Sequence, residues 1–186
     1  MVGWIILAVL AVIVLWLIAT FNGLISLKNQ MLNGWKQIDV QLKRRHDLIP
    51  NLVETVKGVM KFEQATLTQV IEARNKAISA QGIADKAVQE NVLTGALRQL
   101  FALVESYPDL KSNQNVLKLQ EEITSTENRI GFARQFYNDI ATRFNIMQQT
   151  FTANMVAGMF GFKSGELFEI KEAQEKEPPK VDLNLK

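Results

Sequence analysis

The first feature of the sequence is an unbroken run of apolar side chains. Residues 2–21, VGWIILAVLAVIVLWLIATF, carry no charge. As an α-helix rising about 1.5 Å per residue they would span about 30 Å, the thickness of the hydrocarbon core of a bilayer. Their aliphatic side chains would favour insertion by about 4–8 kcal/mol, and the run lacks the polar stripe of a soluble core helix. The pattern therefore predicts that residues 2–21 contact the lipid bilayer as a transmembrane helix.

A cleaved signal peptide is the alternative interpretation of this run. No Lys or Arg precedes it, it exceeds the usual apolar length of about 7–15 residues, and no A-x-A cleavage site follows it. We therefore expect residues 1–22 to be retained as a single-pass anchor. Lys28 and Lys36 follow the run closely, so the positive-inside rule places the remainder of the chain on the cytoplasmic side of the membrane.

Beyond the anchor, apolar residues recur at steps of three, four or seven and predict a helix that continues from the membrane without a linker. They are Leu24, Leu27, Met31, Trp35, Ile38, Leu42, Ile49, Leu52, Val56 and Met60. Pro50 should kink this helix, because proline removes one backbone hydrogen bond and disfavours the α conformation at Ile49. The periodicity resumes at Leu67 and Val70, so we expect the kinked helix to continue to a turn at residues 80–84.

Two further helices complete the predicted bundle. The second runs from about Asp85 to Glu105, with an apolar stripe of Val88, Val92, Ala96, Leu100 and Leu103. The third carries an alternating three-four seam: Val116, Leu119, Ile123, Thr126, Ile130, Ala133, Tyr137, Ile140, Phe144, Met147 and Phe151. Such a seam needs long partners crossing at about 20°, and the short turns make neighbouring helices antiparallel. The predicted fold class is all-α, with the transmembrane helix continuing into a long antiparallel up-and-down bundle at residues 23–162.

The end of the chain departs from this regular pattern. After Phe151 the segment TANMVAGMFGF is broken by glycines and predicts a short fourth helix. Residues 163–186 mix acids, lysines and the pair Pro178-Pro179, a composition typical of a solvated, flexible tail. We expect this tail to have no role or to bind a partner.

Composition excludes several classes of protein. The 21 basic and 19 acidic side chains give a net charge of +2, too small to favour nucleic acid as a partner. With no cysteine there is neither a disulfide framework nor a thiolate nucleophile, and one histidine cannot supply a histidine metal cage. The sequence predicts no metal and no cofactor.

His46 is the candidate acid–base group near neutral pH, and Asp47 follows it. Catalysis would need a second polar group converging on a pocket, so we favour a surface residue on a helical rod. Lys163-Ser164 after Gly161 lacks the G-x-x-x-x-G-K-[ST] spacing of a phosphate loop.

Arg45 falls at an apolar position between Leu42 and Ile49. A buried guanidinium must be paired, and Glu127 or Asp139 on the flanks of the third helix could pair with it, Glu127 being the more plausible. Alternatively, Arg45 extends to water along the helix surface.

Tyr137-Asn138 and Phe144-Asn145 form a seven-residue aromatic-asparagine repeat, with Phe21-Asn22 as a further member. The aromatic rings are best explained as packing, whereas the asparagines could join helices through amide hydrogen bonds. The candidate structural or interaction residues are Arg45, Asp47, Pro50, Asn51, Glu127, Asn128, Arg134, Tyr137, Asn138, Phe144 and Asn145.

Three sequence blocks, together with the apolar run and Phe21-Asn22, resemble the LemA family of bacterial membrane-anchored proteins. They are KRRHDLIPNLVETVKGVMKFE at 43–63, LQEEITSTENRIGFARQFYND at 119–139 and VAGMFGFKSGELFE at 156–169. The resemblance implies one transmembrane helix, a long helical bundle and the bacterial inner membrane, and it supplies no catalytic residue. The family is similar to a magnetosome-associated membrane protein and is considered beside HtpX-type membrane proteases. Phe151-Thr152 stands where Phe-Pro is common in the family, which leaves the end of the third helix open.

Two classes of function fit these features. We favour a non-enzymatic, membrane-anchored scaffold whose helical rod binds partner proteins or associates with copies of itself. The alternative is an envelope-stress or signalling module that modulates a membrane protease such as an HtpX-type enzyme. A hydrolase that uses His46 is a third and weaker hypothesis.

Overall fold

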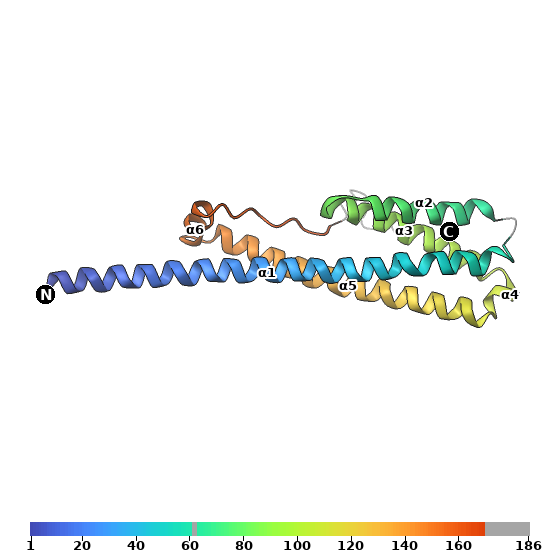
Figure 1. The fold of residues 1–186 in the computed structure, drawn as a ribbon, viewed down its shortest axis with the longest axis horizontal. Coiled ribbons are helices and arrows are strands. Elements are labelled where there is room, and N and C mark those ends of the chain that lie inside the picture. Colours follow the sequence, from blue (N-terminus) through green and yellow to red (C-terminus); the bar gives the residue numbers. More distant parts are fainter. Residues whose placement is uncertain (61–62, 170–186) are drawn as a thin grey trace, which may run out of the picture.

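The computed structural model describes residues 1–60 and 63–169, and every regular element within them is an α-helix. The helices are α1 (Val2–Lys57), α2 (Gln64–Ser79), α3 (Gly82–Val104), α4 (Pro108–Lys111), α5 (Gln114–Gln149) and α6 (Ala153–Met159). The predicted all-α fold class is confirmed. Figure 1 shows α1 as a long rod whose first turns extend beyond the rest of the molecule.

The apolar run continues into the bundle without a linker, because α1 is a single helix of 56 residues. Pro50 lies inside this helix and does not end it. The expectation that one kinked helix also includes the residues of α2 is wrong. Instead α1 ends at Lys57, and Val59 and Met60 each donate a backbone hydrogen bond to the carbonyl of Val56. The chain then reverses, and α2 runs back alongside α1 (Figure 1).

The bundle is built on the antiparallel pair of α1 and α5, which make the most extensive contact between helices. The hairpin of α2 and α3 packs along the half of this pair that is farthest from the N-terminus (Figure 1). Along the other half, the chain after α6 runs back as an extended segment (Figure 1). The α2–α3 hairpin therefore covers one half of the α1–α5 pair, and the extended segment after α6 covers the other half.

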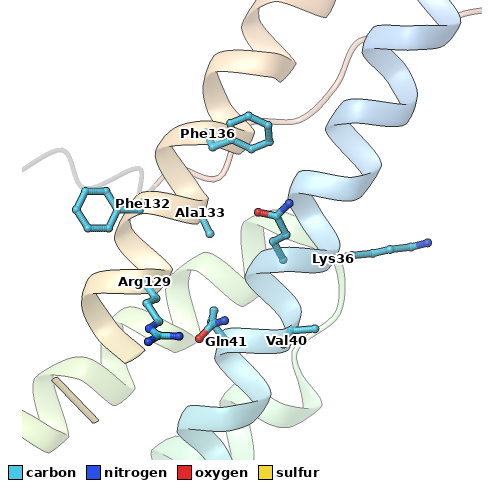
Figure 2. A pocket seen from close by; sticks show the side chains of 8 residues that line it. Lys36, Val40, Gln41, Arg129, Phe132, Ala133 and Phe136 are labelled. Carbon is cyan, nitrogen blue, oxygen red and sulfur yellow. The ribbon is translucent and has the colours of Figure 1, made fainter. Parts of the chain in front are cut away.

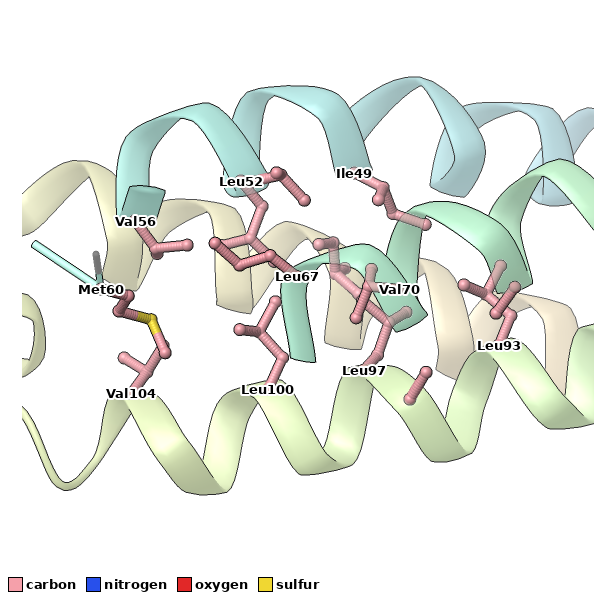
Figure 3. Packing of buried hydrophobic residues seen from close by; sticks show 14 of the residues in the cluster. Ile49, Leu52, Val56, Met60, Leu67, Val70, Leu93, Leu97, Leu100 and Val104 are labelled. Carbon is pink, nitrogen blue, oxygen red and sulfur yellow. The ribbon is translucent and has the colours of Figure 1, made fainter. Parts of the chain in front are cut away.

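The largest apolar cluster fills the end of the bundle far from the N-terminus. Ile49, Leu52 and Val56 of α1 meet side chains of α2 and α3 there (Figure 3). The facing residues include Leu67, Val70, Leu93, Leu97, Leu100 and Val104. Because burying one such side chain contributes about 1.5–3 kcal/mol, this cluster is a main source of stability for the α2–α3 hairpin.

The apolar seam predicted along the third helix is buried over most of its length. Val116, Ile123, Thr126, Ile130, Tyr137, Ile140 and Phe144 are each at most 5% exposed. Asn113 begins the helix, since its side-chain oxygen accepts hydrogen bonds from the backbone N–H groups of Asn115 and Val116. Phe151, the last predicted member, is 84% exposed because α5 ends at Gln149.

The buried side of α3 agrees only in part with the apolar stripe predicted for the second helix. Val88 and Val92 are 47% and 52% exposed, so the prediction that they are buried is wrong. The buried side of α3 carries Ala87, Glu90, Leu93, Ala96, Leu97, Leu100 and Val104. Both stripes obey helical spacing and share Ala96 and Leu100, so spacing alone does not choose between them. Packing against the neighbouring helices decides, and it buries the carboxylate of Glu90.

The sequence predicts that a solvated tail begins at residue 163, soon after α6. That expectation is wrong for residues 163–169, because Phe168 is 1% exposed and its ring lies 5.9 Å from that of Trp35. Residues 170–186, the rest of the predicted tail, lie outside the described residues.

The position of the α3 stripe can be tested by two matched truncations. Leu97→Ala should lower the free energy of unfolding by about 2–5 kcal/mol, because it leaves a cavity in the buried cluster. Val92→Ala, at an exposed site of the same helix, should change it by less than about 0.5 kcal/mol. Chemical denaturation of the full-length protein in micelles, followed by circular dichroism, measures both. A larger loss of unfolding free energy for Val92→Ala than for Leu97→Ala would indicate that the stripe predicted from sequence is the buried one.

Candidate functional site

Charged side chains are buried where α1 packs against α3. Arg45 is 2% exposed and Glu90 is 5% exposed, and the guanidinium of Arg45 pairs directly with the Glu90 carboxylate. The second carboxylate oxygen of Glu90 lies 2.7 Å from Nε2 of His46. The hydroxyl of Thr94 accepts a hydrogen bond from Arg45 at 3.0 Å and donates one to the carbonyl of Glu90. Four residues from two helices thus form one connected polar cluster.

This cluster corrects two expectations from the sequence. Arg45 does not pair with Glu127, which instead lies 3.5 Å from Arg98 on an exposed part of the surface, and Asp139 is also exposed. His46 is not a surface residue, because it is only 8% exposed. The physical reason is that the side of α1 carrying both residues faces α3, and the buried side of α3 includes Glu90, which the predicted stripe does not contain.

Opposing effects act on the pKa of Glu90. Burial would raise this pKa, but the hydrogen bond from His46 and the charge of Arg45 outweigh burial and hold the pKa below its ordinary value of 4.5. The carboxylate therefore stabilises the fold above about pH 4.5, and this contribution is lost as the pH falls through the lowered pKa. At neutral pH Arg45 and Glu90 form an ionised pair within the cluster, and Nε of Arg45 is buried there without a hydrogen-bond partner.

Pro50 explains a further contact of the same region. A residue with a backbone N–H at position 50 would donate to the carbonyl of His46, one turn earlier in α1, and proline cannot. Nε of Arg74, on α2, donates to that carbonyl at a distance of 2.7 Å. The side chain of one helix thus replaces the backbone bond missing from another, which lets α1 continue through Pro50.

The asparagines of the aromatic-asparagine repeat hold the extended segment that follows α6. Asn138 donates to the carbonyl of Phe168 at 3.2 Å and accepts from its N–H at 2.8 Å. Asn145 bonds Gly165 in the same way, at 2.9 and 2.8 Å. Seven residues of helix rise about 10.5 Å, and three extended residues span about 10 Å, so the two spacings match. The asparagines therefore fasten this segment antiparallel to α5 and do not join two helices.

Two other predicted residues complete this attachment. The hydroxyl of Tyr137 donates to the carbonyl of Glu166 at 2.6 Å, and burial raises its pKa. The guanidinium of Arg134 lies 4.6 Å from the centre of the Phe168 ring. Burial, followed by the nearby charge of Arg45, lowers the pKa of Arg134.

The remaining predicted residues are scattered. Asp47, Pro50, Asn51 and Asn128 are exposed on α1 and α5. Phe144 is buried, and its ring lies 6.2 Å from that of Phe162. The sequence predicts no role for Glu90, Thr94 or Arg74. Glu90 shares a helical stripe with Ala87 and Leu97, but spacing alone does not favour that stripe over the one predicted.

An open groove lies between α1 and α5. It has a volume of about 540 Å³ and is lined by Lys36, Gln37, Val40, Gln41, Arg129, Phe132, Ala133 and Phe136. Ala133 and Gln41 lie between the helices, whereas Lys36 and Phe132 point outward on either side (Figure 2). Phe132 is 74% exposed, Val40 62% and Phe136 44%. The groove thus combines apolar side chains with the two cations Lys36 and Arg129, and no acidic residue lines it.

Comparison with known proteins gives a consistent result. A family model described as the LemA family matches residues 34–183. Protein LemA of Metamycoplasma hominis is 29% identical over 157 residues, which cover 82% of this chain and 70% of that protein. Magnetosome protein MamQ 2 of Paramagnetospirillum magneticum is 23% identical over 183 residues, covering 84% and 67% respectively. Magnetosome protein MamQ of Magnetospirillum gryphiswaldense is 22% identical with the same coverage.

The ion pair can be tested by breaking it from one side. Arg45→Met should lower the free energy of unfolding by about 3–5 kcal/mol, because it leaves the Glu90 carboxylate buried without its cation. Adding Glu90→Gln should recover part of that loss, since the amide carries no charge. Arg44→Met, at the exposed neighbouring position, should change stability by less than about 0.5 kcal/mol. Denaturant titrations that gave Arg45→Met and Arg44→Met the same small effect would contradict this assignment.

The role of Arg74 depends on Pro50, which predicts a coupling between the two. Arg74→Met should cost about 1–3 kcal/mol, because the carbonyl of His46 loses its donor. In a Pro50→Ala background the same change should cost less, since the restored backbone N–H takes that carbonyl. A double-mutant cycle from denaturation curves measures the difference. Equal losses in both backgrounds would show that Arg74 acts through another contact.

Proposed function

The chain belongs to the LemA family, and from this premise we propose that it is a non-enzymatic, membrane-anchored adaptor. Residues 2–21 cross the bilayer in a single pass, and the bundle stands on the cytoplasmic side. The groove between α1 and α5 binds an amphipathic helix of a second membrane-associated protein. The observation that carries this proposal is the exposed, apolar and cation-lined groove, which α1 holds at a fixed distance from the membrane.

The exposure of the apolar run supports the proposal that it anchors the chain in the membrane. In the most apolar 18-residue window of α1, none of the residues is buried inside the bundle. A core helix of a soluble protein would be mostly covered by its neighbours, whereas the first turns of α1 extend beyond the bundle (Figure 1). Insertion into the hydrocarbon core of a bilayer would remove these apolar residues from water. Lys28 and Lys36, within 15 residues of the end of the run, support the cytoplasmic orientation.

The chemistry of the groove specifies its partner. An amphipathic helix can lay apolar side chains against Val40, Phe132 and Phe136 while its flanks lie near the rims. Because Lys36 and Arg129 line the groove without an acidic neighbour among its lining residues, flanks rich in Asp or Glu would be favoured. Two copies of this chain facing each other at the same height would oppose like charges, so a different protein is the favoured occupant.

The contacts of His46 support a structural role for the buried polar cluster. His46 is hydrogen-bonded to Glu90 through Nε2, and its carbonyl is held by Arg74. Both contacts position helices, and Glu90 in turn is paired with Arg45. We therefore assign this cluster to the framework that holds the groove.

Site-specific photocrosslinking of the full-length protein in its native membranes tests the adaptor role. A photoreactive residue in place of Val40, which is 62% exposed, should yield a protein adduct, whereas one in place of Val92, which is 52% exposed but lies on α3, should not. The cross-linked peptide should be an amphipathic helix with acidic flanks. Charge reversal by Lys36→Glu with Arg129→Glu should abolish the adduct while leaving the unfolding curve unchanged.

Three results would overturn the proposal. An adduct that maps to this same chain would indicate self-association. Equal labelling from Val40 and Val92 would indicate non-specific collisions in the membrane. An adduct that persists after charge reversal would contradict the assignment of an acidic helix.

A further inference from the structure

The corner at which α5 passes into α6 exposes apolar side chains at high density. Phe151 is 84% exposed, Met159 73% and Met155 68%. Ile146, in the last turns of α5, is 60% exposed, and Phe160, just after α6, is 57% exposed. We call these five residues the apolar corner. Large apolar side chains gathered in this way mark a surface that contacts something other than water.

The other side of α6 is part of the bundle core. Val156 and Ala157 are at most 5% exposed and pack with Leu24 of α1 and Phe144 of α5. The corner is therefore amphipathic: one side fixes α6 to the bundle and the other is directed away from it.

The backbone at both ends of α6 holds this orientation. Thr152 has a φ of 72° and Gly161 has a φ of 67°. A positive φ is rare for a β-branched residue, so it persists only where surrounding contacts require it. The buried side of α6 supplies those contacts, and the turn at Thr152 leaves Phe151 outside.

The apolar corner lies at the height where α1 leaves its apolar run. The ring centre of Phe160 is 4.6 Å from that of Phe21, the last residue of the run. Trp16 lines the same surface hollow as Ile146 and Phe151. A bilayer that surrounds residues 2–21 must therefore also reach the apolar corner.

This end of the molecule is cationic. Residues 1–38 and 140–165, which include the parts of α1, α5 and α6 that meet here, contain no Asp or Glu. Lys28 lies 5.9 Å from the ring centre of Phe162, Arg143 lines the hollow beside Phe151, and Lys163 is exposed. Apolar side chains bordered by cations are the pattern of a surface that inserts shallowly among anionic headgroups.

We infer that the apolar corner is a second membrane contact, lying in the interfacial layer of the bilayer that residues 2–21 cross and favouring anionic lipids. The inference rests on the anchoring part of the proposed function and is independent of the groove. It gives the bundle two attachments to the membrane, one that spans it and one that lies on its surface.

The natural absence of cysteine allows a direct test. Single variants Met155→Cys, Leu10→Cys and Val92→Cys of the full-length protein are labelled with a polarity-sensitive fluorophore and reconstituted into vesicles of phosphatidylcholine with phosphatidylglycerol. Leu10 lies in the apolar run, and Val92 is exposed on α3 as the matched control. Quenchers attached to the lipid headgroup or to the acyl chain then report the depth of each site.

The inference predicts that the Met155 label is quenched by the headgroup quencher, the Leu10 label by the acyl-chain quencher and the Val92 label by neither. Omitting phosphatidylglycerol, or introducing Arg143→Gln with Lys163→Gln, should reduce quenching at Met155 and leave Leu10 unchanged. If Leu10 is quenched while Met155 behaves like Val92, the second contact is overturned and the anchor stands. If Leu10 is not quenched, the anchor itself fails. Quenching at Met155 that is indifferent to lipid charge would overturn the preference for anionic lipids.

Discussion

The carboxylate of Glu90 is the buried charge on which the arrangement of the bundle depends. An unpaired carboxylate in this position would be strongly destabilising, so α3 can pack only where cations or donors meet it. Arg45 and His46, consecutive on α1, supply both oxygens with partners. A shift of α3 by one turn would instead place the carboxylate opposite Leu42 or Ile49. The ion pair thus selects one register among several that the apolar packing would accept.

His46 also helps to position α2. Pro50 frees the carbonyl of His46, and Arg74 binds it, so the side chain of His46 reaches α3 while its backbone is held by α2. The hairpin is therefore fixed at one point by polar contacts and along its length by the cluster around Leu97. Proline inside the helix, which sequence reasoning treats as a disruption, here creates an acceptor that a neighbouring helix uses.

The sequence predicts the parts of this structure that follow from regular spacing. The apolar run, its continuation into the bundle and most of the α5 seam are examples, because each offers a single consistent stripe. The α3 stripe could not be located in this way, since two overlapping stripes are possible and only the incorrect one is free of charge. Glu90 can be buried because Arg45 and His46 of α1 pair with its carboxylate. Such pairing is a tertiary contact between helices that are far apart in the sequence. Likewise, Gly165 and Phe168 are held through backbone amides, which leave no mark on the sequence beyond the spacing of Asn138 and Asn145.

The continuity of α1 has a mechanical consequence. Lys57 lies 36 residues beyond Phe21 in the same helix, a distance of about 54 Å at about 1.5 Å per residue. A tilt of about 20°, usual for a membrane-spanning helix, would displace this far end sideways by about 18 Å. With residues 2–21 in the bilayer, as proposed, a change in bilayer thickness that alters the tilt would be transmitted along the whole of α1, because no flexible joint interrupts this helix. The anchored protein would then act as a lever, whose short arm is the apolar run and whose long arm carries the bundle.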